Sequence, residues 1–286
     1  MNDEKVEIKK DSSGGLLWHF TSVDALPKIL LGDDGLLAGN TLFMDDPYDC
    51  QLSRNIVKIV VQLLEALRTG NSYNGVQNNP GIKRWLNSGA AMPTFVTCFT
   101  NAVNDSKMWQ FRAKQDCVAI GFDPAIRRYF RKCPDKVFNV SFKKCDYISY
   151  DAVSNQIDNI YEKVSKRILP YAGIMNSSTR SAISQVVDDL LDVAKKLVFV
   201  KKKSYRWEKE SRAAFILSDA DLLRSRLRFI DGKPYVRALD PTIFRRLVKS
   251  IRISPFGDVA RVSSISYLIG KAVGLVPSQI EPYELK

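Results

Sequence analysis

Short apolar runs recur along this chain, each bounded by glycine, proline or small polar residues. Runs of about four to eight residues that are rich in β-branched and aromatic side chains predict β-strands. The dipeptide Asp231-Gly232 stands between two such runs and predicts a two-residue hairpin turn. Strands are predicted at 16–21, 94–100, 117–122, 137–142, 145–150, from about 207 to 217, 226–230, 233–237 and 247–254, with an extended segment at 36–43.

Other stretches repeat apolar residues at positions three and four apart, which predicts helices with one buried face. Capping signals help to place the shorter helices, because Pro27 suits a first helical turn and Asp123-Pro124 combines an N-cap with a proline at the next position. Helices are predicted at 25–31, 52–67, 124–132, 151–168, 179–198 and 258–273, with a short helical segment opening at 108–109, a long loop at 71–93 and a connector at 241–246.

The predicted strands outnumber complete strand–helix repeats, so the pattern favours an α+β fold over a doubly wound parallel sheet. No internal repeat, low-complexity tract or clear linker divides the chain. We therefore predict a single α+β domain over 1–286. The polar segment 1–13 is expected to be flexible, and 151–198 to form a helical insertion or subdomain.

Composition limits the classes of protein further. Lys and Arg number 43 against 31 Asp and Glu in 286 residues, a net charge of +12 that favours an anionic partner such as nucleic acid or a nucleotide. No stretch is apolar for long enough to form a membrane helix, and the charged N-terminus lacks the apolar centre of a secretory signal. Five cysteines without CxxC spacing argue against a disulfide framework or a zinc ribbon. We expect a cytoplasmic protein without membrane contact.

The stretch 203–217 concentrates the candidate chemistry. A strand starting near Trp207 places Glu208, Glu210 and Arg212 on one sheet face, because side chains alternate along a strand. One interpretation is a solvated strand start in which Arg212 neutralises one glutamate. The other is a site where a glutamate orients a hydroxyl group or stabilises developing positive charge. The spacing alone favours neither.

Two further features restrict the mechanism. His19 is the chain's one histidine, so a mechanism that needs a histidine pair or a histidine-rich metal site is excluded. The acidic run at Asp45, Asp46 and Asp49 contains Pro47 and lacks the glycine of a calcium-binding turn, so we interpret it as turn and helix-cap residues. No metal site is expected.

Several short motifs together resemble the bacterial family catalogued as domain of unknown function 2971, over nearly the whole chain. Where that family is expected to have Asn-Asp-Pro, this chain has Asp45-Asp46-Pro47. The motifs are Trp18-His19-Phe20-Thr21-Ser22, Asp45-Asp46-Pro47-Tyr48-Asp49, Thr97-Cys98-Phe99-Thr100, Met108-Trp109, Gly121-Phe122, Trp207-Glu208-Lys209-Glu210-Ser211-Arg212 and Ile251-Arg252-Ile253-Ser254-Pro255.

That family in turn looks like a distant relative of the ADP-ribosyltransferases, which implies a split mixed or antiparallel sheet and NAD as substrate. The resemblance implies a catalytic role for Glu210, beside the ribose, and for Glu208, which would position the acceptor or take its proton. It also implies that His19 binds a ribose hydroxyl group. The Ser-Thr-Ser triplet of the superfamily is missing here. The remaining residues implied to bind NAD are Thr21, Ser22, Tyr48, Thr97, Thr100, Trp109 and Arg212.

Structural roles suit the same residues. A histidine between Trp18 and Phe20, tryptophans in general and strand threonines are all common core components. Arg212 is suited to pair with a phosphate, but its neighbouring glutamates are the favoured partners.

Three functions therefore stay open. The resemblance favours an NAD-consuming ADP-ribosyltransferase or NAD glycohydrolase, as a bacterial toxin or antiphage effector acting on nucleic acid or protein. The second is a non-catalytic sensor that binds a nucleotide or a phage component. The third is a metal-dependent nuclease built on the three aspartates and two glutamates.

Overall fold

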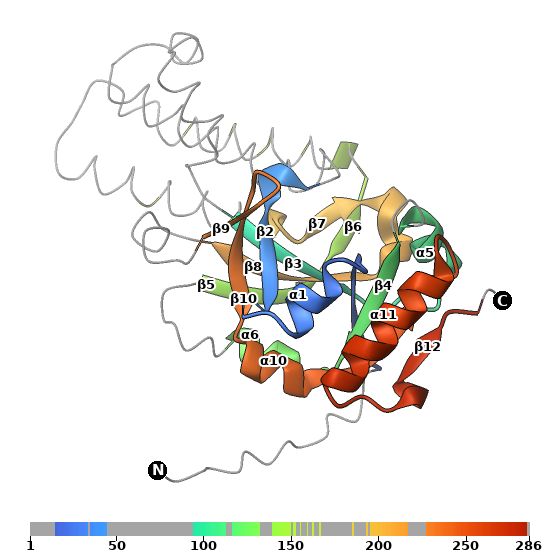
Figure 1. Ribbon diagram of the computed structural model, residues 1–286. Coiled ribbons are helices and arrows are strands. Elements are labelled where there is room, and N and C mark those ends of the chain that lie inside the picture. Colours follow the sequence, from blue (N-terminus) through green and yellow to red (C-terminus); the bar gives the residue numbers. More distant parts are fainter. Residues whose placement is uncertain are drawn as a thin grey trace, which may run out of the picture.

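The structure is a computed structural model that describes residues 15–33, 35–44, 94–112, 116–131, 139–149, 198–216 and 227–284, together with scattered positions between 151 and 197. Strands dominate the described chain, and shorter helices lie around them (Figure 1). The strands are β1 (Leu17–Ser22), β2 (Leu36–Asn40), β3 (Thr94–Thr100), β4 (Cys117–Phe122), β5 (Asn139–Lys144), β6 (Asp146–Ile148), β7 (Val200–Lys202), β8 (Glu210–Ile216), β9 (Arg228–Ile230), β10 (Lys233–Leu239), β11 (Val248–Ile253) and β12 (Ile280–Pro282).

The helices are short, apart from the last. The α-helices are α1 (Leu26–Leu30), α5 (Ser106–Arg112), α6 (Ile126–Arg131), α10 (Pro241–Leu247) and α11 (Val259–Ala272), and the 3-10 helices are η1 (Thr41–Phe43), η3 (Lys203–Glu208) and η4 (Pro277–Gln279).

Ten strands form one sheet that branches at β3. Along the main path the strand order is β12-β11-β4-β1-β3-β2-β10-β9, and β8 pairs with β3 and β5 off this path. All pairs in this sheet are antiparallel except β11 with β12, while β6 and β7 form a separate parallel pair. The result is a mixed sheet that is mostly antiparallel, as an α+β fold requires.

One edge of β3 is shared by two strands. β2 pairs with its first residues, at Phe95 and Val96, whereas β1 pairs with its last residue, at Thr100. The other edge of β3 pairs along its whole length with β8. The sheet therefore splits between β1 and β2, and the middle of β3 lies at the split.

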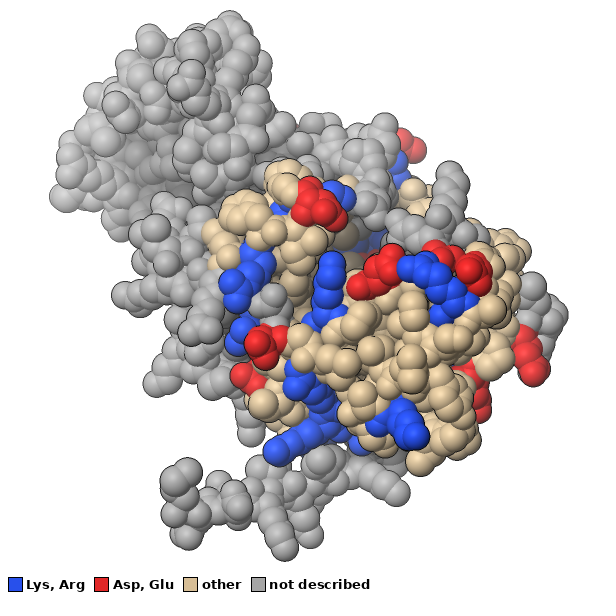
Figure 2. Space-filling view, viewed as in Figure 1, with Lys and Arg blue, Asp and Glu red and all other residues tan. Residues whose placement is uncertain are grey.

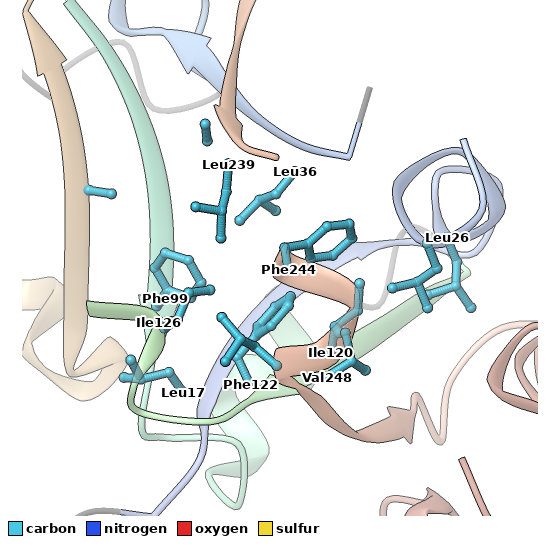
Figure 3. Packing of buried hydrophobic residues seen from close by; sticks show 14 of the residues in the cluster. Leu17, Leu26, Leu36, Phe99, Ile120, Phe122, Ile126, Leu239, Phe244 and Val248 are labelled. Atoms are coloured by element: carbon cyan, nitrogen blue, oxygen red, sulfur yellow. The ribbon is translucent and has the colours of Figure 1, made fainter. Parts of the chain in front are cut away.

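The main hydrophobic core fills one side of this branched sheet (Figure 3). Phe99 is its aromatic centre, with ring centroids 6.0 Å from Phe122 and 5.7 Å from both Phe130 and Phe142. Leu17 and Phe244, which are fully buried, join the same cluster from β1 and α10. Strands from both branches supply this core, so its burial fixes the angle at which the branches meet.

Helix α11 covers β11 and β12 (Figure 1). Asp258 caps its first turn by accepting a hydrogen bond of 2.9 Å from the Arg261 backbone N–H, and Gly274 ends it at a φ of 84°. Gly270 lets the helix approach the sheet, because a Cβ atom there would lie 2.4 Å from Ile280 Cδ1.

Most of the predicted elements are confirmed, including β3 and β4 at their predicted bounds. The hairpin is confirmed as well, since Asp231 and Gly232 both have positive φ, as a type I′ turn requires. The described residues between 151 and 197 all lie in helices, but their organisation as an insertion stays a prediction. The segments 1–13, 52–67 and 71–93 lie outside the described residues.

Three predictions of local structure were wrong. The connector 241–246 is helix α10, because Asp240 accepts a 2.8 Å hydrogen bond from the Thr242 backbone N–H and proline occupies the first turn. The segment expected to be extended over 36–43 is strand only as far as Asn40, and η1 begins at Thr41. The strand expected from Trp207 begins at Glu210, because 3-10 helix η3 precedes it. Strands β7 and β12 were not predicted.

Candidate site at buried carboxylates

A sharp turn brings the two candidate glutamates to the same place. Glu208 ends η3 and Glu210 begins β8, with Lys209 between them at a φ of 45°. This left-handed conformation is uncommon for lysine and costs energy unless the surroundings stabilise it. The sequence had predicted that both glutamates lie on one strand and share a face by alternation. In the structure they are neighbours through a helix-to-strand turn instead.

Lys201, on β7, bridges the two carboxylates. Its Nζ donates to Glu208 Oε2 and lies 2.6 Å from Glu210 Oε2. Glu210 Oε1 accepts a 2.5 Å hydrogen bond from Arg212 Nε, and Arg212 Nη1 donates to the Val198 carbonyl oxygen over 2.7 Å. Glu208, Glu210 and Arg212 expose only 8%, 6% and 0% of their surface. We call Lys201, Glu208, Glu210 and Arg212 the charge cluster.

The burial of these residues shows that their interpretation as a solvated strand start was wrong. The glutamates do not lie at a solvated strand start, although Arg212 does pair with Glu210 as that interpretation expected. Two carboxylates and two cations balance in charge, so the cluster avoids an unpaired buried charge. Buried ion pairs of this kind still lose hydration, and they are weak evidence for a purely stabilising role.

The two carboxylates differ in proton affinity. Burial raises the pKa of Glu208 to about 7, and the Glu210 charge adds to this, against the lowering by Lys201. Burial would also raise the pKa of Glu210, but the charges of Arg212 and Lys201 outweigh it and hold that pKa well below its usual range. Glu210 is therefore always ionised near neutral pH, whereas Glu208 exchanges its proton there.

Hydrogen bonds to the backbone fix the turn that carries the glutamates. Thr100 Oγ1 donates to the Glu208 carbonyl oxygen and accepts a 2.8 Å hydrogen bond from the Ala102 backbone N–H. The Tyr147 hydroxyl oxygen accepts a 2.7 Å hydrogen bond from the Glu210 backbone N–H, and burial raises the pKa of this phenol. Thr100 thus acts on the site through the main chain.

Lys201 and Tyr147 were missed from the sequence as parts of the site. Lys201 stands in a run of three lysines at 201–203, which contributes to the net positive charge, and Tyr147 stands in a predicted strand. They meet the glutamates because β6 pairs with β7 beside the start of β8, a tertiary contact that leaves no local sequence signal.

His19 lies on the opposite face of the sheet from the charge cluster. Its ring centroid is 5.9 Å from that of Phe99, which belongs to the main core. The cluster side instead carries Trp18 and Thr100, which are direct cross-strand partners, and Thr100 is in turn the partner of Glu210. His19 and the carboxylates therefore do not share one surface in this structure.

At the split in the sheet, side chains bond to the backbone. His19 Nδ1 donates to the Cys98 carbonyl oxygen over 2.9 Å, because a carbonyl oxygen can only accept. Thr97 Oγ1 donates to the Leu37 carbonyl oxygen over 3.0 Å, and Thr97 also lies on the core face, two residues from both Phe95 and Phe99. Both side chains thus donate to backbone carbonyl oxygens at the point where β1 and β2 diverge.

The other residues implied to bind NAD are dispersed. Trp109 is fully buried, donates from Nε1 to the Val103 carbonyl oxygen over 2.7 Å and stacks on Tyr283. Ser22 Oγ accepts from the Ala25 backbone N–H over 3.2 Å before α1, and Thr21 is partly buried on β1. Tyr48 lies outside the described residues. Of the site residues that the resemblance implies, the structure thus brings together Glu208, Glu210, Arg212 and Thr100.

Within the described part of the chain, no group of three or more His, Cys, Asp and Glu side chains is arranged to hold a metal ion. Asp45, Asp46 and Asp49, on which the nuclease alternative depends, lie outside the described residues, so that alternative stays untested. None of the described helices has the length and apolar character needed to cross a membrane.

The architecture defines the class of protein as α+β, with a mostly antiparallel sheet that branches at β3 and a buried charge cluster beside the branch. No family model matches the chain, and neither a curated protein nor a solved structure matches it.

Proposed function

We propose that this protein is an NAD-consuming enzyme of the ADP-ribosyltransferase type, related to the family of unknown function 2971 named above. The observation that carries the proposal is the pair of adjacent buried carboxylates with opposite pKa shifts, Glu208 raised to about 7 and Glu210 lowered. Neighbouring acids whose environments separate their pKa values are typical of acid–base sites. The split in the sheet at β3 is a second supporting feature, since the superfamily resemblance implies such a split.

Each carboxylate suits one part of the reaction. The bond between nicotinamide N1 and ribose C1′ breaks, nicotinamide leaves with the bonding electrons, and an oxygen or nitrogen of the acceptor or of water attacks C1′. Glu210, ionised at all relevant pH values, supplies negative charge to the oxocarbenium-like transition state. Its two oxygens have further lone pairs beyond those that Arg212 and Lys201 occupy, so they accept a ribose hydroxyl group as well.

Glu208 takes the proton that the attacking group releases. A base with a pKa close to the working pH combines a useful ionised fraction with adequate proton affinity, and about 7 meets that condition. In the proposed complex, Arg212 orients Glu210 and Thr100 holds the turn. His19, on the opposite face of the sheet, has no part in it. Because Glu208 is only 8% exposed, substrate entry requires movement of the chain around it.

The test is NAD consumption by purified protein, followed as nicotinamide release with RNA, DNA and protein offered as acceptors. Glu210→Gln keeps the shape of the side chain and removes its charge, so turnover should fall by at least about 100-fold. The exposed Glu281→Gln is the matched control, and melting temperatures show that both variants are folded. Absence of turnover in the wild type, with no rise of its melting temperature on adding NAD, would reject the proposal.

A second function, a non-catalytic nucleotide-binding sensor, is favoured by one specific observation. Both oxygens of Glu210 are already engaged, by Lys201 and by the fully buried Arg212, which is also the pattern of a structural ion network. A nucleotide that raises the melting temperature without nicotinamide release would support the sensor.

A further inference from the structure

The outer side of η3 presents aromatic and basic side chains next to the charge cluster. Phe111, on α5, exposes 52% of its surface, although it is a phenylalanine. Its ring packs edge to face with Trp207, which is partly exposed, at a centroid distance of 5.8 Å and an angle of 66°. Tyr205, on the same short helix, instead packs toward the charge cluster, with Lys201 Nζ 5.3 Å from its ring centroid.

Exposed basic residues lie on the same segment as Trp207. Lys203, Arg206 and Lys209 are all exposed, and the one acidic residue within 201–209, Glu208, faces inward to Lys201. We call Phe111, Trp207 and these three exposed basic residues the aromatic–basic surface. On the face in Figure 2, by contrast, basic and acidic side chains are interspersed in small groups, so the net charge alone does not mark a binding surface there.

We propose that the aromatic–basic surface binds single-stranded nucleic acid, with a base stacked on the Phe111–Trp207 pair and phosphates beside Lys203, Arg206 and Lys209. Proteins that bind single strands combine aromatic platforms for the bases with cations that follow the backbone. A single exposed phenylalanine is ordinary, but one paired with a tryptophan whose own segment carries three exposed cations is chemically complementary to a stacked, anionic polymer.

The position of this surface deepens the proposed function. Trp207 and Lys209 flank Glu208 in the chain, so a strand bound here lies beside the segment that carries the residue proposed to take the acceptor's proton. That further step, in which the bound strand is the ADP-ribose acceptor, rests on the proposed function. Binding itself does not, and it is measured without NAD.

Fluorescence anisotropy with labelled single-stranded DNA and RNA of about ten nucleotides tests binding by the full chain at low salt. Phe111→Ala should weaken binding about tenfold, the loss expected for one stacked base. Phe229→Ala is the matched control, because Phe229 is 69% exposed on the distant strand β9. This variant should bind the oligonucleotides with the affinity of the wild type. An oligonucleotide of the same length with abasic positions should bind weakly, and equally to wild type and Phe111→Ala.

The charge contribution is tested separately by salt dependence. The double variant Lys203→Gln/Arg206→Gln should lower the slope of log affinity against log salt by about 1.4, since each phosphate contact to a single strand contributes about 0.7. The control Lys249→Gln/Lys271→Gln, also at exposed positions, should leave the slope unchanged. The proposal is overturned by no binding at low salt, by equal binding of polyglutamate, or by binding that Phe111→Ala does not weaken. Binding without any turnover of NAD would support the nucleic-acid-binding surface and reject only the proposal that the bound strand accepts ADP-ribose.

Discussion

Strand β8 has two faces that are equally buried and chemically opposite. Ala213 and Phe215 are fully buried in the main apolar core. On the other face, Glu210 and Arg212 are buried in the charge cluster. The alternation of the strand thus separates an apolar face from an ionic one by a single residue.

The two faces make different contributions to the free energy. Apolar burial stabilises the fold directly, at roughly 25 cal/mol for each Å² removed from water. The charged groups of the cluster lose hydration on burial, and ion pairing offsets only part of that cost. A protein in which apolar residues of the same volume replace a buried ion pair is often as stable. The apolar face therefore has a sufficient explanation in folding, whereas the ionic face suggests a function beyond stability.

The largest expected effect comes from Arg212→Met. Removing the fully buried guanidinium takes one partner from Glu210 and the donor from the Val198 carbonyl, so the free energy of unfolding should fall by about 3–5 kcal/mol in urea titrations. Phe215→Ala on the apolar face should lose a similar amount, about 3–5 kcal/mol.

Rescue then separates the two faces. Adding Glu210→Met to Arg212→Met removes the uncompensated carboxylate and should recover about half of the loss or more, because Lys201 and Glu208 still form a neutral pair. If Arg212→Met costs less than about 1 kcal/mol, the cluster is more hydrated than its burial indicates.

A somewhat smaller effect should appear in the pH dependence of stability. The folded-state pKa of Glu208, about 7, lies above its ordinary value of 4.5, so between these values the folded state binds more protons than the unfolded state. The stabilisation by this group is complete below about pH 4.5 and is lost as the pH rises through 7. The loss amounts to about 3 kcal/mol at most.

Glu208→Gln mimics the protonated side chain and should abolish that loss. The difference in unfolding free energy between pH 5 and pH 8 should therefore be smaller for Glu208→Gln than for the wild type. The exposed Glu281→Gln should show the same difference as the wild type. A pH dependence that is the same in all three proteins would contradict the raised pKa.

The smallest effect distinguishes the two threonines of β3. Thr100→Val leaves the Glu208 carbonyl and the Ala102 N–H without their partner and should cost about 1–3 kcal/mol. Thr97→Val removes one hydrogen bond, to the Leu37 carbonyl, and should cost about 1 kcal/mol. Thermal unfolding measures both, and an equal cost would mean that Thr100 does not fix the turn that carries the glutamates.

Local sequence signals predicted most of the described elements. β-branched and aromatic runs gave β3 and β4, and Asp231-Gly232 gave the hairpin, because these signals act within a few residues. The missed helix α10 had such a signal as well, in Asp240-Pro241. The start of β8 was placed too early because Lys209 adopts a conformation that lysine rarely adopts.

The sequence by itself determined that this is an α+β protein, that Glu208, Glu210 and Arg212 are neighbours, and that its charge is strongly basic. Only the tertiary structure decided that Lys201 and Tyr147 complete the cluster and that His19 faces the opposite side of the sheet. The reason is physical: a strand's alternation fixes which residues share a face, but pairing between strands distant in sequence decides what each face meets.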